Sequence, residues 1–438
     1  MPAIQYIAFW VLLLLPILVL AQDTEESEKK IELSGFGELD HISYFSREDG
    51  KINNRNQAIL QTQLKAKISA NSSLYTTLEI RNDLSDARRN RVFLDESYID
   101  ISTKRFDFRL GRQIVNWGEA DGLNPTNHFN AVDLSDLLDF EREELSIYGI
   151  RTKYYYKDVK FDFVFSPVFV PALLPADSSS RWLPSLPDQV PNPFEPPPAT
   201  INAQYRFEQA NPLQNYNFAE DWQLGIRSSF QWPWLDASVS YYKGWNDVPK
   251  FSQAINVLNP NLLEISFIPR HYQWQFIGMD FSTATGKFGW RGESALIISD
   301  TPREGDVEKD PVFYHYVVGV DRSFANIIGD NNLFVILQWS HKIIFEGGSF
   351  PADDLNHIFQ RSLLLRLEQD LGAYAKFHLQ AVYDVLYGGL YFQPKLRYAI
   401  RDGLNLEALA DILGGKSGSF FHQYRNNDRL QIRLEYSF

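Results

Sequence analysis

The stretch Leu430-Gln431-Ile432-Arg433-Leu434-Glu435-Tyr436-Ser437-Phe438 decides the fold of this chain. Apolar side chains stand at every second position, and polar or charged side chains stand between them. Successive residues of a β-strand point to opposite faces, so the stretch predicts a strand with one apolar and one polar face. At a chain end such a strand would invite aggregation unless a closed sheet covered its edge. The pattern therefore favours a β-barrel over a soluble edge strand.

The same alternation recurs along the chain in segments of roughly ten residues, the length that a tilted membrane strand needs. It is clearest in 60–68, 222–231, 390–398 and 404–412, where apolar residues take one parity and polar residues take the other. A soluble β-sandwich shows this pattern locally but rarely sustains it over so many segments. The chain is therefore expected to be all-β and to form a transmembrane, antiparallel, up-and-down β-barrel.

About 18 strands can be assigned from this pattern, with about 16 as the alternative. In the tenth, 269–282, apolar side chains hold one parity up to Phe276 and the other from Ile277, which predicts a β-bulge. The expected strands lie near 31–45, 57–69, 73–82, 92–102, 105–114, 145–156, 159–168, 221–231, 235–244, 269–282, 287–297, 312–323, 332–343, 357–369, 372–385, 389–400, 403–413 and 427–438.

The connections between these strands alternate in length. Short turns at one end and long loops at the other are typical of outer-membrane barrels, and an even strand number places both chain ends on the periplasmic side. The longest loops are expected near 115–144 and 169–220, and 245–268 is also read as a loop; Pro167 to Pro212 is too rich in proline for a central strand. Tight turns are marked by Asn71-Ser72, Lys157-Asp158, Pro233-Trp234, Gly286-Lys287 and Asp402-Gly403.

The beginning of the chain has the features of a secretory signal. Residues 1–22 carry no charged side chain. At the end of the apolar run 7–20, Val19-Leu20-Ala21 loosely matches a small-residue cleavage site. The run is short for the roughly 20 residues that span a membrane, and acidic residues follow it instead of a basic stop signal. The pattern favours a signal peptide at 1–21 over a membrane anchor, and a single barrel domain at 22–438.

The composition agrees with an exported barrel. The 438 residues include 22 Tyr, 32 Phe and 10 Trp, which suits aromatic girdles at the two membrane surfaces. The formal net charge of −13 argues against a nucleic-acid partner. There are no cysteines, so neither disulfides nor a lipid-modified cysteine are expected.

The most distinctive motif is Leu110-Gly111-Arg112-Gln113-Ile114-Val115-Asn116-Trp117-Gly118-Glu119-Ala120-Asp121-Gly122-Leu123-Asn124-Pro125-Thr126, which follows Leu94-Asp95-Glu96-Ser97-Tyr98-Ile99-Asp100. These residues resemble a group of outer-membrane, porin-like barrels, largely of unknown function, with a Gly-Arg-Gln…Trp-Gly…Asn-Pro signature. The resemblance covers about 92–156 and the closing strand. It implies an outer-membrane channel or transporter and names no substrate. Phe438 resembles the terminal aromatic residue that the barrel-assembly machinery reads.

The connection 115–144 is strongly acidic, and strands beside it carry basic residues on their polar faces. If the connection folds into the barrel, opposed acidic and basic rows would filter solutes by charge. The alternative is an external acidic loop beside lumenal charges that pair with one another. The candidate constriction residues are Glu119, Asp121, Asp133, Asp136 and Asp139, and the candidate lumenal bases are Lys65, Lys67, Arg81, Arg109, Arg151 and Lys153.

Catalytic and metal chemistry find little support in the sequence. Among 8 histidines, His341 directly follows Ser340, so the two point to opposite faces of a strand and cannot form a nucleophile–base pair. No group of His, Asp and Glu has metal-ligand spacing, and there is no glycine-rich phosphate loop. We expect no enzyme activity, no cofactor and no metal.

The resulting hypothesis is a porin-like channel in the outer membrane of a Gram-negative-type bacterium, through which small polar or charged solutes diffuse. Its partners would be outer-membrane lipid, the barrel-assembly machinery and small-molecule solutes, with a homo-oligomer as an option. Two alternatives stay open. One is a surface adhesion or binding protein that acts through its long loops, and the other is a transporter of apolar compounds with the proline-rich loop as a lid.

Overall fold

The computed structural model describes residues 31–85, 87–139, 144–175, 180–183, 186–197, 199–208, 221–300 and 307–438. The predicted signal peptide at 1–21 lies outside these residues, as does part of the proline-rich region. No helix among the described residues has the length and apolar character needed to cross a membrane.

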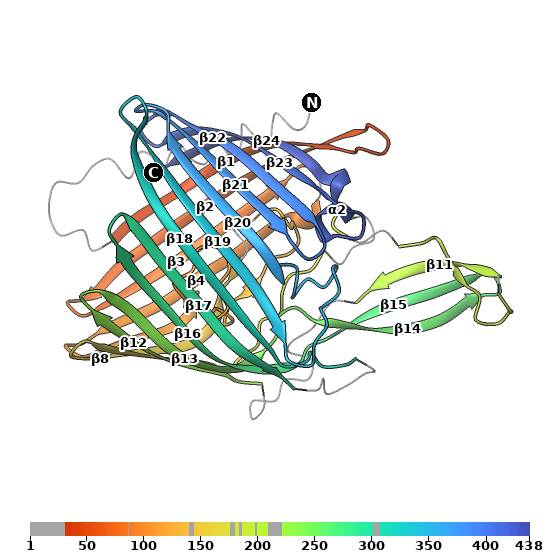
Figure 1. Cartoon of the computed structure of the whole chain (residues 1–438), viewed down its shortest axis with the longest axis horizontal. Coiled ribbons are helices and arrows are strands. Elements are labelled where there is room, and N and C mark those ends of the chain that lie inside the picture. The colour runs from red at the N-terminus through yellow and green to blue at the C-terminus, as the bar shows by residue number, and fades with distance from the viewer. Residues whose placement is uncertain are drawn as a thin grey trace.

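Eighteen antiparallel strands form one closed sheet, the barrel of Figure 1. The last strand pairs with the first, which places Ser437 opposite Phe36 and closes the barrel. The antiparallel barrel and its strand number are confirmed, and the alternative of fewer strands is wrong. The barrel strands are β1 (Ile31–Phe45), β2 (Ile52–Ser69), β3 (Ser72–Asp83), β4 (Arg91–Ser102), β5 (Phe106–Gln113), β8 (Ile147–Tyr156), β9 (Val159–Ser166), β12 (Gln223–Trp232), β13 (Leu235–Trp245), β16 (Gln273–Thr285), β17 (Phe288–Ser299), β18 (Phe313–Ile328), β19 (Asn331–Ile344), β20 (Arg361–Asp370), β21 (Ala375–Asp384), β22 (Gly389–Arg401), β23 (Leu404–Gly415) and β24 (Asp428–Ser437).

The apolar faces of the strands point outward and the polar faces point into the barrel. In β24, Leu430 and Ile432 are 44% and 45% exposed, whereas Arg429, Gln431 and Arg433 are 5%, 3% and 5% exposed. The inward groups are covered by neighbouring wall residues and by loops, but the described residues leave the outward ones open. An apolar belt of this kind is stable against lipid rather than water.

The tight turns lie at one end of the barrel and most of the long connections lie at the other. Figure 1 shows the turns on the left and, on the right, the loops with the short helix α2 (Phe420–Gln423). We call these the turn end and the loop end. In the turns, Gly286 and Gly403 have φ of 63° and 74°, a backbone shape that glycine adopts without steric cost.

Aromatic side chains gather near both ends of the outer surface. At the turn end, Trp232 stacks on Phe230 and on Trp234, with ring centroids 5.7 and 6.4 Å apart. Nearer the loop end, Trp339 Nε1 donates to the Tyr316 hydroxyl at 3.4 Å. Trp and Tyr prefer the level of the lipid headgroups, so these groups mark the limits of the apolar belt.

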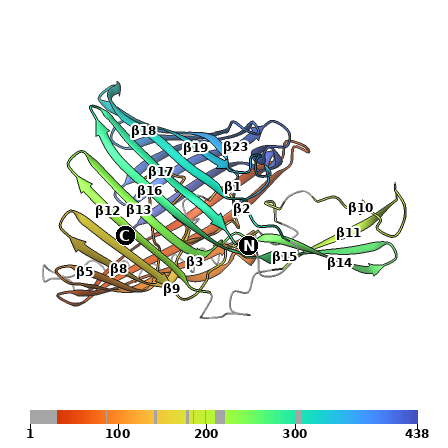
Figure 2. The same ribbon diagram turned by 60° about the horizontal axis from the view of Figure 1, so that its bottom comes forward.

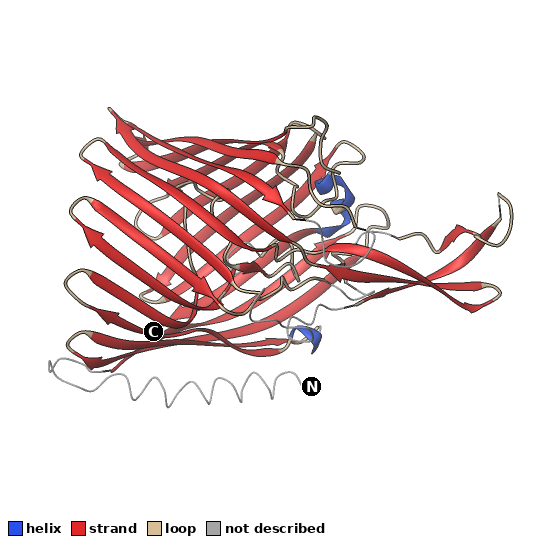
Figure 3. Cartoon of the chain, turned by 90° about the horizontal axis from the view of Figure 1, so that it is seen from below, coloured by secondary structure: helices blue, strands red, loops and turns tan. Residues whose placement is uncertain are grey.

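A second sheet of four strands projects from the loop end, clear of the barrel wall (Figures 2 and 3). Residues 169–220 and 245–268, predicted to be loops, contain the strands of this sheet, so the prediction is corrected in part. The parallel pairing of β11 with β15 joins connections that are far apart in the chain, which alternation within one segment cannot reveal. The strands of this sheet are β10 (Gln189–Pro191), β11 (Thr200–Phe207), β14 (Lys250–Asn259) and β15 (Leu262–Arg270).

The β-bulge predicted for the tenth barrel strand is wrong. The register of β16 with β13 and with β17 is unbroken. Trp274 and Phe276 point inward and are 6% and 2% exposed, whereas Ile277 and Met279 point outward and are 59% and 58% exposed. The aromatic pair faces inward because the barrel interior at this level is an apolar core rather than a wet lumen.

Candidate functional site

Residues 114–146, between β5 and β8, run through the inside of the barrel, and we call them the crossing segment. They include the short strands β6 (Ala131–Val132) and β7 (Glu144–Leu145), which pair with each other, while 140–143 lie outside the described residues. The segment bonds to Glu293 of β17 and to arginines of β2 and β24. In the order of the closed sheet β17 lies opposite β2, so the segment spans the lumen.

One part of the crossing segment is fastened to Glu293. Its carboxylate accepts hydrogen bonds from the main-chain N–H groups of Glu119 at 3.1 Å, Ala120 at 3.3 Å and Thr126 at 2.7 Å. The Thr126 hydroxyl donates to it as well, at 2.8 Å. A hydrogen bond of this kind contributes about 0.5–1.5 kcal/mol. Glu293 therefore helps to hold residues 119–126 against the wall.

The signature residues Trp117 and Gly118 serve the same attachment. Trp117 is 1% exposed, packs edge-on against Phe129 with centroids 5.1 Å apart, and has its Nε1 3.4 Å from Asp162 of β9. Gly118 has a φ of 98°, and a Cβ at this position would collide with the Glu293 carboxylate. Only glycine combines that backbone shape with so close an approach.

Ion pairs fasten the opposite part of the crossing segment. Arg55 Nη1 of β2 and Arg429 Nη1 of β24 lie 2.9 and 3.2 Å from Asp136 Oδ2, and Arg91 Nη1 of β4 lies 2.9 Å from Asp133 Oδ2. Burial raises the pKa of Asp136, but the charges of Arg429 and Arg55 hold it well below its usual value. Both carboxylates are buried. Their negative charges are therefore balanced by these arginines and not by water.

The other three candidate acids keep more access to water. Arg227 Nη2 lies 3.5 Å from Glu119 Oε1, and Arg291 Nη1 lies 2.5 Å from Asp121 Oδ2. The side chains of Glu119 and Asp121 are 41% and 29% exposed. Asp139 is half-buried and borders a small cavity of about 50 Å³. The structure thus brings all five acids inside the barrel but gives them different surroundings.

The six candidate bases share the inward face of their strands. The three arginines pair with acids of the wall, whereas Lys65 and Lys67 are exposed and Lys153 is half-buried. The described lumen therefore holds arginines paired with acids of the wall, along with lysines of greater exposure. The pairs are Arg81 with Glu79 at 3.2 Å, Arg109 with Asp100 at 2.8 Å and Arg151 with Asp162 at 2.5 Å.

A cavity of about 280 Å³ lies between the crossing segment and the loops that follow β19 and β23. We call it the loop-end chamber. Asp136, Leu138 and Asp139 border both the chamber and the small cavity beside β24, so the crossing segment separates the two spaces. Apolar walls of the chamber include Leu134, Leu137, Trp274, Leu355, Phe359 and Phe421.

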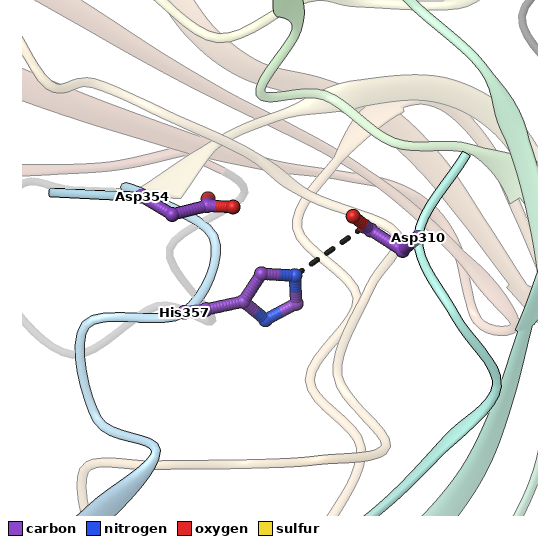
Figure 4. Close-up of side chains that lie close together, drawn as sticks. All are labelled: Asp310, Asp354 and His357. Carbon is purple, nitrogen blue, oxygen red and sulfur yellow. Dashed lines mark hydrogen bonds and ion pairs between the residues drawn. The ribbon is translucent and has the colours of Figure 1, made fainter. Parts of the chain in front are cut away.

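Asp310, Asp354 and His357 bring potential metal-ligand atoms within 4.8 Å of one another (Figure 4). His357 Nε2 lies 3.3 Å from Asp310 Oδ2. Lys250 Nζ lies 2.5 Å from Asp310 Oδ1, and Lys342 Nζ lies 3.1 Å from His357 Nδ1. Burial and the charge of Lys342 lower the pKa of His357 to about 3. Two ammonium groups thus compete for the atoms a metal would need, and the group ties loops to β14 and β19.

Ser340 bonds to a histidine that is distant in the sequence. His315 Nε2 of β18 lies 3.0 Å from Ser340 Oγ, and this hydroxyl donates to the Phe359 carbonyl at 3.1 Å. Ser340 is fully buried. Its proton is engaged and its oxygen is out of reach of a substrate, so the pair packs the loop after β19 onto the wall. Sequence spacing carries no sign of this contact between strands.

Part of the chain is similar to a family of proteins. Residues 42–141, from β1 through most of the crossing segment, match the family described as Protein of unknown function (DUF1302). The match covers less than half of the chain. No curated protein matches the sequence.

Two solved structures align with most of the chain. A loop-deletion mutant of OmpT, an outer membrane protein of Vibrio cholerae, aligns with a TM-score of 0.44 and 10% identity over 94% of this chain and 100% of that chain. A triple mutant of the Rhodopseudomonas blastica porin aligns with a TM-score of 0.43 and 11% identity over 93% of this chain and 100% of that chain.

Proposed function

We propose that this chain is an outer-membrane channel through which small polar or charged solutes diffuse, with the crossing segment as its constriction. The observation that carries the proposal is the attachment of this segment to opposite walls, by Glu293 on one side and by Arg55 and Arg429 on the other. A barrel of about 18 strands leaves room for an aqueous path. A segment fixed across that path sets its width.

Charged side chains on the inward faces of β20 to β22 support the passage of polar solutes. The side chains of Arg366, Lys376 and Arg397 are 46%, 45% and 41% exposed. Glu368 and Asp370 lie 2.5 and 3.4 Å from the first two. Solvated charges of both signs favour a water-filled interior, because ions taken out of water carry a desolvation penalty of several kcal/mol.

Within the constriction, Glu119 and Asp121 would select solutes by charge. Their side chains are more exposed than those of Asp133 and Asp136, and they lie beside Arg227 and Arg291 of the wall. Opposed charges across a narrow path create a transverse field. In this proposal Asp133 and Asp136 hold the segment in place, and Asp139 borders the path.

The outer membrane of a Gram-negative-type bacterium is the location that fits the apolar belt and its aromatic limits. The last residue supports this proposal. Phe438 N donates to the Gly35 carbonyl at 2.9 Å, and Gly35 N donates to the Phe438 carbonyl at 3.0 Å, so the final residue lies in the closing seam. We propose that the assembly machinery reads Phe438 before this seam closes.

Conductance across a planar lipid bilayer tests the channel. The refolded full barrel should give stable current steps that are proportional to voltage. Electrical silence of protein whose heat-modifiable gel mobility shows that it is folded would contradict the proposal. Silence together with saturable binding to cells would favour the adhesion alternative.

A further inference from the structure

We propose that a group of side chains on the outer wall of the barrel binds a phosphate-bearing lipid of the leaflet at the loop end. The group consists of Tyr316 on β18, Trp339 and His341 on β19, and Arg361 on β20, and we call it the outer cluster. The three strands are neighbours in the wall (Figure 1). The inference needs a barrel that sits in a membrane, but it does not depend on whether the barrel conducts.

The side chains of the outer cluster point away from the lumen. Val317, Ser340 and Ser362, which adjoin the cluster on the three strands, are 0% exposed and face into the barrel. Successive residues of a strand point to opposite faces, so the cluster faces outward. Arg361 itself is exposed. Its guanidinium is therefore open to whatever surrounds the barrel.

The outer cluster lies where the apolar belt ends on the side of the loop end. Arg361 is the first residue of β20, and the pair of Trp339 and Tyr316 belongs to the aromatic groups that mark this limit. Toward the turn end the outer surface continues with Leu337 and Leu363, which are 40% and 39% exposed. Acyl chains cover the level of these leucines, and headgroups lie at the level of the cluster. A headgroup phosphate is thus an anion within reach of Arg361.

The hydrogen bonds within the cluster all run in one direction, toward the hydroxyl of Tyr316. Arg361 donates from Nε and Nη2 to His341 Nε2, at 3.4 and 3.2 Å. A guanidinium can only donate, so Nε2 accepts and the proton of the imidazole ring sits on Nδ1. His341 Nδ1 lies 3.3 Å from the Tyr316 hydroxyl oxygen and therefore donates to it. Trp339 Nε1, which also can only donate, bonds to the same oxygen at 3.4 Å.

This arrangement leaves the outer cluster with hydrogen-bond donors and a positive charge. The Tyr316 oxygen receives two hydrogen bonds, so its own proton is left to donate to a group outside the cluster. Among the described residues, no carboxylate lies within ion-pair distance of Arg361. A phosphate supplies both a negative charge and several acceptor oxygens, and arginine matches its geometry well. A cationic headgroup would be repelled, and a neutral lipid would leave the charge of Arg361 unmatched.

Phosphatidic acid and diacylglycerol with the same acyl chains are matched probes, because they differ only by the phosphate. Native mass spectrometry of the folded full chain, released from detergent, gives the affinity for each lipid by titration. We expect phosphatidic acid to bind about tenfold more tightly than diacylglycerol, because only the phosphate makes charge-assisted contacts. Arg361→Gln should remove this preference, and Tyr316→Phe should reduce it by about threefold. The matched control is Arg366→Gln, which removes the same charge from the same strand but on the inward face.

Equal affinities of the natural protein for the two lipids would overturn the inference, and so would a preference that survives Arg361→Gln. The same loss in Arg366→Gln would show that net charge alone attracts the lipid, and would overturn the site. An unchanged preference in Tyr316→Phe would remove the hydroxyl from the contact. Heat-modifiable gel mobility checks that each variant is folded.

Inorganic phosphate, added at the same concentration as the lipid, separates a lipid from a free anion. It should not displace phosphatidic acid, because it cannot contact the leucines beside the cluster, and displacement would overturn the lipid as the occupant. Conductance of the same preparations separates the two proposals. Voltage-proportional steps without a lipid preference leave the channel and remove the lipid site, whereas a lipid preference without conductance removes the channel and leaves the lipid site.

Discussion

Glu293, on the inner face of β17, accepts a hydrogen bond of 2.7 Å from the main-chain nitrogen of Thr126, and both residues are buried. The two are 167 positions apart in the chain. This bond, with the bonds from Glu119 and Ala120 to the same carboxylate, decides where the crossing segment meets the barrel wall. The position of residues 119–126 against the wall therefore depends on this buried carboxylate.

Replacing Glu293→Gln should loosen the crossing segment. The amide nitrogen of Gln cannot accept from the N–H groups that now point at the carboxylate, so we expect a loss of about 2–4 kcal/mol in the free energy of unfolding. Single-channel recordings should show larger and noisier steps. The matched variant Glu368→Gln, at a partly exposed ion pair of β20, should change both quantities little. Similar behaviour of the two variants would show that Glu293 is not the anchor.

Gly118→Ala and Gly122→Ala separate backbone strain from close approach. Both glycines have positive φ, 98° and 91°, so both variants should lose about 1–2 kcal/mol from the backbone alone. Only the new Cβ at position 118 meets the Glu293 carboxylate; nothing lies within 4 Å of the one at 122. Urea denaturation should therefore show an additional loss of about 1–3 kcal/mol for Gly118→Ala. Equal losses would refute the role of the close approach.

Asp136→Asn should be destabilising, by about 2–3 kcal/mol, because it removes one of the two carboxylates that each buried arginine contacts. Arg55 keeps Asp83 at 2.7 Å and Arg429 keeps Asp411 at 2.5 Å. The lowered pKa of Asp136 also predicts a pH dependence. Its contribution is complete above about pH 4, the unfolded pKa, and is lost as the pH falls toward the lowered folded value. Urea midpoints from pH 7 to pH 3 should decrease less in the variant than in the natural protein. A variant as stable as the natural protein at pH 7 would contradict this account.

Asp247 should have the opposite effect on stability. Burial raises its pKa from 3.8 to about 6, so the folded state favours the protonated form. Its favourable contribution is present below about pH 4 and is lost as the pH rises through 6. Asp247→Asn keeps an oxygen that can accept from Val132 N, now 2.9 Å from the carboxylate, without the charge. We expect the variant to be more stable at pH 7 and to lose the dependence between pH 4 and 6; an unchanged pH profile would argue against this assignment.

The double substitution of Glu119→Gln and Asp121→Asn should shift ion selectivity toward anions. It leaves Arg227 and Arg291 without the carboxylates that now lie 3.5 and 2.5 Å away. The reversal potential of the channel under a KCl gradient measures the shift. The control is Asp158→Asn, which also replaces a carboxylate by an amide but lies in an exposed turn. No difference between the double variant and the control would remove these two acids from the constriction.

The sequence by itself determined the wall of the barrel. Polarity with period two is a local property, and each strand shows it without knowledge of its neighbours, as in β24 from Leu430 to Tyr436. The tight turns were predictable for the same reason, since Gly286 and Gly403 mark them locally. The acidic character of the crossing segment and its Trp117-Gly118 motif were also visible, but not what they contact.

Only the tertiary structure decided how the interior is filled. Asp136 meets Arg55 and Arg429, which are 81 and 293 positions away, because closing the sheet brings β2 and β24 together. The sequence predicts a β-bulge in β16, whereas Trp274 faces inward in an unbroken strand. An apolar residue looks the same in a sequence whether it faces lipid or a buried core. The loop-end chamber is built from loops that share no local pattern. Contacts of this kind depend on the closure of the whole barrel. No short stretch of sequence carries the information about that closure.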